Sequence, residues 1–154
     1  MTHPASEKRA LYLEDLNVGD RFMSEGHALD AEQIKAFAVL FDPQPFHTDE
    51  EAAKGTFFGG LAASGWHTAA ITMRLLVNSG LPLANGIIGS GGQLSWPQPT
   101  RPGDVLRVES EVIEITPSRS KPDRGMVQMR CETRNQRGEV LQHFLPKLVV
   151  MRRP

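Results

Sequence analysis

The sequence predicts an α+β fold in which an antiparallel β-sheet wraps around one central apolar helix. Apolar residues recur at helical spacing in the first half of the chain and alternate with polar residues in the second half. Residues 65–77 are apolar almost all round, which is typical of a buried helix. Short turns join the later strands, which favours antiparallel neighbours. We predict a single domain over all 154 residues, without internal repeats.

Composition excludes several classes of function. The 17 Lys and Arg balance 18 Asp and Glu, and the net charge is -1. The sequence therefore has no excess of positive charge that would indicate binding to nucleic acid or to an acidic membrane. The single cysteine, Cys131, excludes an internal disulfide, and its place in an alternating apolar row predicts a core thiol. No apolar run reaches the roughly 18 residues that suggest a membrane helix. We therefore expect a cytoplasmic protein whose partners are small molecules or proteins.

The first half of the chain carries helix start and stop signals. Residues 1–10 are polar, and we expect a loose tail. Turn residues precede a strand predicted over residues 21–29. Asp30 with Gln33 forms a capping-box-like start for a helix that ends at Asp42.

A second capping box, Thr48 with Glu51, predicts a short helix over residues 49–54. The apolar loop over residues 56–63 contains two glycines, where backbone can approach a ligand closely. Ser64 is then predicted to cap the central helix.

Four strands are predicted after residue 82. A change of apolar face near Val112 predicts a bulge in the second strand. Pro146 predicts an edge position or a bulge in the last strand, because proline cannot donate to the ladder. The predicted strands cover residues 86–96, 104–116, 126–135 and 139–151.

The first candidate site is a carboxylate and an imidazole, Asp42 and His47, separated by Pro43 and Pro45. Residues five apart on a helix lie roughly 140° from each other, so the pair could not share a helical face. The prolines favour a turn, which can bring the two side chains together. Such a pair can hold and activate a water. The alternative is that Asp42 only ends a helix and His47 is an ordinary loop residue.

The start of the central helix is the second candidate. Its unpaired N–H groups and positive dipole end could hold an oxyanion at Ser64–Gly65, and a glycine there removes a blocking side chain. The alternative is that Ser64 is only an N-cap and Gly65 a packing residue.

Other patterns give weaker or negative signals. The glycine-rich residues 89–94 fit no nucleotide-binding motif. The remaining histidines lack metal-binding spacing, so we predict no metal and expect His67 and His143 to be packed or at the surface. Arg119, Lys121 and Arg124 cluster in a polar loop, where they could bind the phosphate groups of a cofactor or simply be solvated.

Three segments together resemble the MaoC-like acyl-CoA dehydratases, also called (R)-specific enoyl-CoA hydratases. They are residues 37–53, which contain D-P-Q-P-F-H, residues 58–65, which are F-G-G-L-A-A-S-G, and residues 97–104, which follow P-x-x-x-x-P-G-D. The resemblance spans most of the chain. It implies the hot-dog fold, a long helix wrapped by an antiparallel sheet, with active sites at the interface of a dimer. We therefore expect a homodimer or a higher oligomer.

The resemblance also implies roles for single residues. Asp42 and His47 would hold the water that adds to C3 of a trans-2-enoyl-CoA, reversibly forming a 3-hydroxyacyl-CoA. The Gly65 N–H would bind the thioester oxygen, and Ser64 would support the Asp/His turn by hydrogen bonding. No cofactor is implied, because the CoA thioester is itself the substrate. The residues expected to contact substrate are Phe58, Gly59, Gly60, Trp66, Arg119 and Lys121.

Two positions depart from the family pattern. Gln44 stands where many members have asparagine, and Trp66 stands where a methionine is expected. The bulky ring of Trp66 would restrict the acyl pocket and favour short or unusual acyl groups.

Two alternative functions stay open. A hot-dog acyl-CoA thioesterase would hydrolyse the same thioesters, but such enzymes usually carry a carboxylate on the central helix, and residues 65–77 contain no Asp or Glu. The chain could also be one subunit of a heteromeric dehydratase. Because it keeps both Asp42 and His47, it would then be the catalytic subunit.

Overall fold

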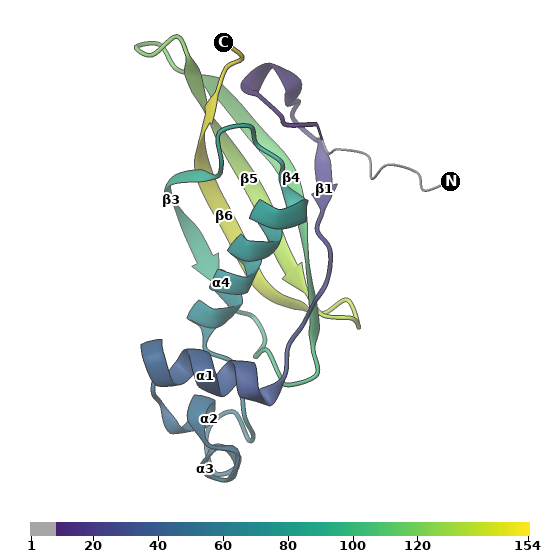
Figure 1. The fold of residues 1–154 in the computed structure, drawn as a ribbon, viewed down its shortest axis with the longest axis vertical. Coiled ribbons are helices and arrows are strands. Elements are labelled where there is room, and N and C mark those ends of the chain that lie inside the picture. The colour runs from purple at the N-terminus through teal and green to yellow at the C-terminus, as the bar shows by residue number, and fades with distance from the viewer. Residues whose placement is uncertain (1–8) are drawn as a thin grey trace, which may run out of the picture.

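The computed structural model describes residues 9–154, and residues 1–8, most of the predicted tail, lie outside the described residues. In the described part, six strands form one antiparallel sheet, and helix α4 (Gly65–Leu75) crosses one of its faces (Figure 1). The strand order is β1-β4-β5-β6-β3, with β2 also paired to β4. The predicted α+β fold is therefore confirmed, with the sheet and central helix of a hot-dog arrangement.

The bounds of the strands are β1 (Arg21–Met23), β2 (His27–Ala28), β3 (Ile88–Ser95), β4 (Val105–Pro117), β5 (Arg124–Arg134) and β6 (Val140–Met151). The other helical elements are η1 (Leu13–Asp15), α1 (Ala31–Phe41), α2 (Pro45–Thr48), α3 (Glu50–Lys54) and the π-helical turn η2 (Leu76–Gly80), which extends α4.

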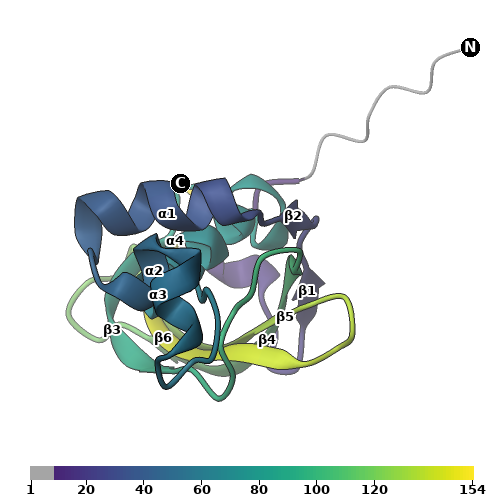
Figure 2. The same ribbon diagram turned by 90° about the horizontal axis from the view of Figure 1, so that it is seen from below.

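Helices α1, α2 and α3 gather at one end of the molecule, beside the N-terminal end of α4 (Figures 1 and 2). As predicted, the Asp30 side chain caps α1 by accepting the Gln33 N–H at 2.9 Å. The prediction of Thr48 as the next cap is wrong. Asp49 takes that role, because its carboxylate accepts the N–H groups of Glu51 and Ala52. Thr48 instead ends α2.

The strand predicted over residues 21–29 is divided into β1 and β2. At Ser24, between them, the backbone N–H donates to Val108 O, but the Val108 N–H is accepted by the Ser24 hydroxyl at 2.8 Å. A side chain therefore replaces the carbonyl that a continuous ladder would use. The segment from β1 to β2 therefore runs beside β4 without forming one continuous strand.

The predicted bulge in β4 is confirmed by a register shift between Val112 and Glu114. Pro146 does not end β6. On its β3 side Pro146 pairs with Gly92, whereas the pairing with β5 passes from Gln128↔Lys147 directly to Cys131↔Phe144. The missing proline N–H is thus tolerated inside the sheet as a local gap in one ladder.

The core lies between α4 and the sheet. Ile71 and Leu75 of α4 are buried against strand residues that include Val108 and Met129. Cys131 is fully buried, as predicted, and burial raises the pKa of its thiol to about 11 despite a hydrogen bond from Ser110. Within the described residues, no helix is long and apolar enough to cross a membrane.

The expectation that α4 is buried all round is wrong. Trp66 is 61% exposed, Met73 36% and Val77, just beyond the helix, 59%. These residues follow helical spacing and form one apolar stripe on the face turned away from the sheet.

Candidate active site

The Asp/His pair is positioned by the ends of two helices. Asp42 follows α1, where its N–H still donates to Ala38 O at 2.8 Å. The chain then reverses at Pro43, and Pro45 opens α2, so His47 sits within a single helical turn. This reversal brings Asp42 Oδ2 to 3.3 Å from His47 Nε2. The two side chains meet as expected, although the second part of the predicted turn is helical.

The His47 ring is held from its other side. His47 is only 4% exposed, and its Nδ1 lies 2.6 Å from Ala62 O. A carbonyl oxygen can only accept, so Nδ1 carries a proton, and in the neutral form of the ring the lone pair is then at Nε2. Nε2 and the Asp42 carboxylate are then two acceptors side by side. This arrangement suits a water that donates to both.

Asp42 is kept ionised by its neighbours. Its partial burial raises the pKa of the carboxyl, but hydrogen bonds from Ser64 and Gln44, together with the charge that the His47 ring carries when protonated, outweigh burial and hold the pKa below its usual value. The Gln44 amide donates to Asp42 Oδ1 at 2.6 Å. Ser64, fully buried, also accepts the Trp66 N–H at 3.3 Å and so caps α4. One hydroxyl therefore joins the carboxylate to the start of α4.

A cavity of about 440 Å³ opens beside this pair and is walled by His47, Phe57, Phe58, Ala63, Gly65, Thr68, Trp96, Pro97, Gln98, Pro99 and Thr100. Gly65 is the first residue of α4, so its N–H has no partner within the helix. An added Cβ at Gly65 would lie only 2.6 Å from the Trp96 ring. The space left by the missing side chain is therefore occupied by an indole, which the sequence did not indicate.

The glycine loop before α4 is fixed by one arginine. Arg101 donates to Phe58 O at 2.5 Å, to Gly60 O at 3.0 Å and to Leu61 O at 3.3 Å. Phe58 lines the cavity, whereas Gly59, at φ 65°, and Gly60 shape the loop without lining it. Arg101 was missed because a lone arginine after a proline turn gives no sequence signal for carbonyl binding.

Three predicted substrate contacts lie elsewhere. Trp66 packs edge to face against Trp96 at 5.3 Å but points to solvent, outside the cavity lining. Arg119 and Lys121 are exposed in the β4–β5 loop, at the end of the molecule opposite α1, α2 and α3 (Figure 1). Within one chain these cations do not meet the Asp/His pair.

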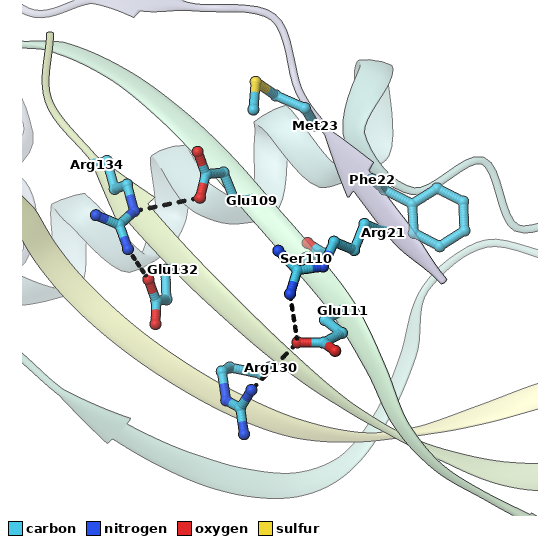
Figure 3. A pocket seen from close by; sticks show the side chains of 9 residues that line it. All are labelled: Arg21, Phe22, Met23, Glu109, Ser110, Glu111, Arg130, Glu132 and Arg134. Atoms are coloured by element: carbon cyan, nitrogen blue, oxygen red, sulfur yellow. Dashed lines mark hydrogen bonds and ion pairs between the residues drawn. The ribbon is translucent and has the colours of Figure 1, made fainter. Parts of the chain in front are cut away.

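A second hollow, of about 460 Å³, lies over β1, β4 and β5 (Figure 3). Glu111 pairs with Arg130 at 3.2 Å and with Arg21 at 3.8 Å, while Arg134 lies between Glu109 and Glu132. The carboxylates that line this hollow, those of Glu109, Glu111 and Glu132, are thus each paired with an arginine. Among the described residues, no group of His, Cys, Asp and Glu is arranged to hold a metal. The chemistry therefore points to the first cavity.

Comparison with known proteins decides the family. Residues 17–133, more than half of the chain, match the family described as MaoC like domain. This chain belongs to the MaoC-like family. Among its relatives, a 3-hydroxybutyryl-CoA dehydratase of Methylorubrum extorquens is 31% identical over 115 residues, 75% of this chain and 72% of the relative.

Solved structures agree with this assignment. A MaoC-like dehydratase from Rhodospirillum rubrum is 68% identical, with a TM-score of 0.93 over 94% of this chain and 99% of that one. The unliganded R-hydratase PhaJ1 from Pseudomonas aeruginosa is 26% identical, with a TM-score of 0.77 over 94% of this chain and 88% of that one. The hot-dog fold and the predicted family resemblance are confirmed.

Proposed function

We propose that this MaoC-like chain catalyses the reversible hydration of a trans-2-enoyl-CoA to a 3-hydroxyacyl-CoA. The observation that carries the proposal is the 3.3 Å contact between buried His47 Nε2 and Asp42 Oδ2, beside a cavity that also reaches the start of α4. The R-hydratase neighbour supports the reaction class, and the relative named 3-hydroxybutyryl-CoA dehydratase supports a CoA thioester as substrate.

In the hydration direction, a water held between His47 Nε2 and Asp42 gives a proton to the pair as its oxygen bonds to C3. The electrons of the C2=C3 bond move toward the thioester oxygen. The Gly65 N–H and the positive end of α4 stabilise this developing enolate. The enolate then takes the proton at C2. Water is added without any change of oxidation state, so the proposal requires no redox cofactor.

We also propose that the working unit is a homodimer or a higher oligomer. Trp66, Met73 and Val77 leave an apolar stripe exposed along α4, and β3 is an edge strand that is exposed over most of its length. Contiguous apolar surface and an open strand edge both favour association.

The proposal is tested by following the ultraviolet absorbance of the conjugated enoyl thioester while purified protein acts on crotonyl-CoA, with thiol release assayed in parallel. We expect absorbance to fall with no free thiol. Thiol release would instead assign a thioesterase, which α4 does not favour because it carries no Asp or Glu. A chain active only with a second, different subunit would be part of a heteromer.

A further inference from the structure

We propose that this site selects a short acyl group bearing a neutral hydrogen-bonding group, such as a hydroxyl, beyond C3. Trp96, Thr68 and Thr100 would be the residues that make this selection. The inference rests on the proposed hydration and refines its substrate. It replaces Trp66, which points to solvent, with Trp96 as the residue that limits acyl length.

Trp96 closes the cavity as a fixed wall. Its ring lies against Gly65 so closely that a Cβ at Gly65 would be 2.6–2.8 Å from three ring atoms. Its Nε1 donates to Gln142 Oε1 at 2.9 Å, and Gln142 is fully buried. Swinging the indole aside would leave a buried amide oxygen without its partner, which is unfavourable. The wall is therefore held by a hydrogen bond as well as by packing.

The space behind this wall is filled with paired polar groups. Gln142 Nε2 donates to Thr72 Oγ1 at 3.0 Å, and Thr72 Oγ1 lies 2.6 Å from Thr133 Oγ1. Thr72 also donates to Thr68 O at 2.9 Å. Thr72, Thr133 and Gln142 are at most 1% exposed. A long hydrocarbon chain thus finds no apolar channel between α4 and the sheet, and opening one would break this network.

Two hydroxyls of the wall offer a hydrogen bond to the ligand. Thr68 and Thr100 both line the cavity, and their Oγ1 atoms lie 2.9 Å apart. Each hydroxyl has one proton, and one shared hydrogen bond uses only one of the two. Because neither hydroxyl has another hydrogen-bond partner among the described residues, we take the second proton to be available to an acceptor on the acyl group. An apolar acyl end would cover this hydroxyl without pairing it, which is unfavourable.

The wall is also neutral. Among the described residues, no Lys or Arg lines the cavity, and the nearby Arg101 guanidinium donates to three backbone carbonyls. A carboxylate on the acyl group would be desolvated there without a cation to pair it. The geometry therefore favours a hydroxyl or another neutral group.

The test compares kcat/KM for hydration of three trans-2-enoyl-CoAs. The substrates 4-hydroxybut-2-enoyl-CoA and pent-2-enoyl-CoA have acyl chains of equal heavy-atom count that differ by a hydroxyl in place of a methyl, and oct-2-enoyl-CoA extends the chain. For the wild-type protein we expect the hydroxyl substrate to exceed its methyl counterpart roughly 10-fold. Oct-2-enoyl-CoA should be more than about 100-fold poorer than pent-2-enoyl-CoA.

Substitutions in the cavity wall, with one control, assign these preferences to residues. Trp96→Ala should raise the octenoyl-to-pentenoyl ratio about 10-fold, whereas Trp66→Phe, which keeps an aromatic ring against Trp96, should leave the ratio unchanged. If Trp96→Ala fails to fold, Trp96→Phe, which keeps a ring but cannot donate to Gln142, should raise the ratio to a smaller extent. The double variant Thr68→Val/Thr100→Val keeps the shape of both side chains and should remove the hydroxyl preference.

The outcomes separate this inference from the proposed function. Efficient hydration of oct-2-enoyl-CoA by the wild type, or equal rates with the hydroxyl and methyl substrates, would overturn the inference while hydration itself stands. A ratio that responds to Trp66→Phe and not to the Trp96 variants would also overturn it. No hydration of any of the three thioesters would end the proposed function, and this assignment with it.

Discussion

At the scale of single residues, the site depends on a carboxylate and a ring whose roles can be separated from folding. Asp42→Asn and His47→Ala should each lower kcat/KM for crotonyl-CoA by about 10²–10⁴-fold, the range for loss of a general acid–base group. Asp30→Asn is the matched control, because asparagine caps a helix as well as aspartate and Asp30 lies at the far end of α1. Circular dichroism should show all three variants folded. Undiminished turnover in Asp42→Asn would remove the pair from the mechanism.

The neighbours of Asp42 set its titration. Ser64 and Gln44 lower the pKa of Asp42, so Ser64→Ala and Gln44→Met should each raise it and move the acidic limb of the kcat/KM profile to higher pH. Because the folded-state pKa is lowered, the stability that Asp42 contributes is present above its unfolded pKa and is lost as pH falls through the folded one. Only Ser64→Ala also removes the cap of α4, which should lower stability by about 1 kcal/mol. Equal thermal shifts in the two variants would contradict this division of roles.

At the scale of elements, the packing of α1 on α4 contains a histidine that must stay neutral. His67 stacks on Phe37 with ring centroids 4.5 Å apart, and its buried Nδ1 has no hydrogen-bond partner among the described residues. Burial, and then the charge of His27, lower the pKa of His67 from 6.5 to about 4.

This histidine predicts an acid-sensitive contact. Between pH 6.5 and about 4 the unfolded chain binds a proton at residue 67 that the folded chain does not, so stability falls as pH falls, by up to about 1.4 kcal/mol per pH unit. His67→Phe, which keeps a ring against Phe37, should flatten this dependence in urea unfolding measured at several pH values. His143→Phe, at a half-exposed position on β6, should leave it intact. An unchanged slope in His67→Phe would mean that other groups cause the acid sensitivity.

At the scale of the whole molecule, the exposed stripe on α4 predicts self-association. Met73→Asp should place a charge in the proposed interface and shift the protein toward the monomer in analytical ultracentrifugation. Met23→Asp is the control, because Met23 is also exposed but lies at the second hollow, over β1, β4 and β5. A wild-type chain that sediments as a monomer at all concentrations would exclude the homodimer.

The sequence predicted the fold and the meeting of Asp42 with His47 because both follow from local chemistry, namely apolar periodicity and the prolines of one short segment. It missed Trp96 against Gly65, since that contact joins a strand end to a helix start that are remote in the chain. The distant location of Arg119 and Lys121 was missed for the same reason. The cap at Asp49 was missed because Thr48 and Asp49 are both good capping residues, and only the preceding helical turn decides between them.

The Ala62 peptide, finally, has a consequence for inheritance. Its N–H donates to Phe46 O at 3.0 Å and its carbonyl holds His47 Nδ1 at 2.6 Å, so the tautomer of the imidazole is set by backbone atoms alone. Every amino acid has a main-chain carbonyl, so no substitution at residue 62 can remove this acceptor. A single substitution can therefore remove the Asp42 carboxylate or the His47 ring. The Ala62 carbonyl, which fixes the proton on His47 Nδ1, is kept in every variant whose loop backbone follows the same path.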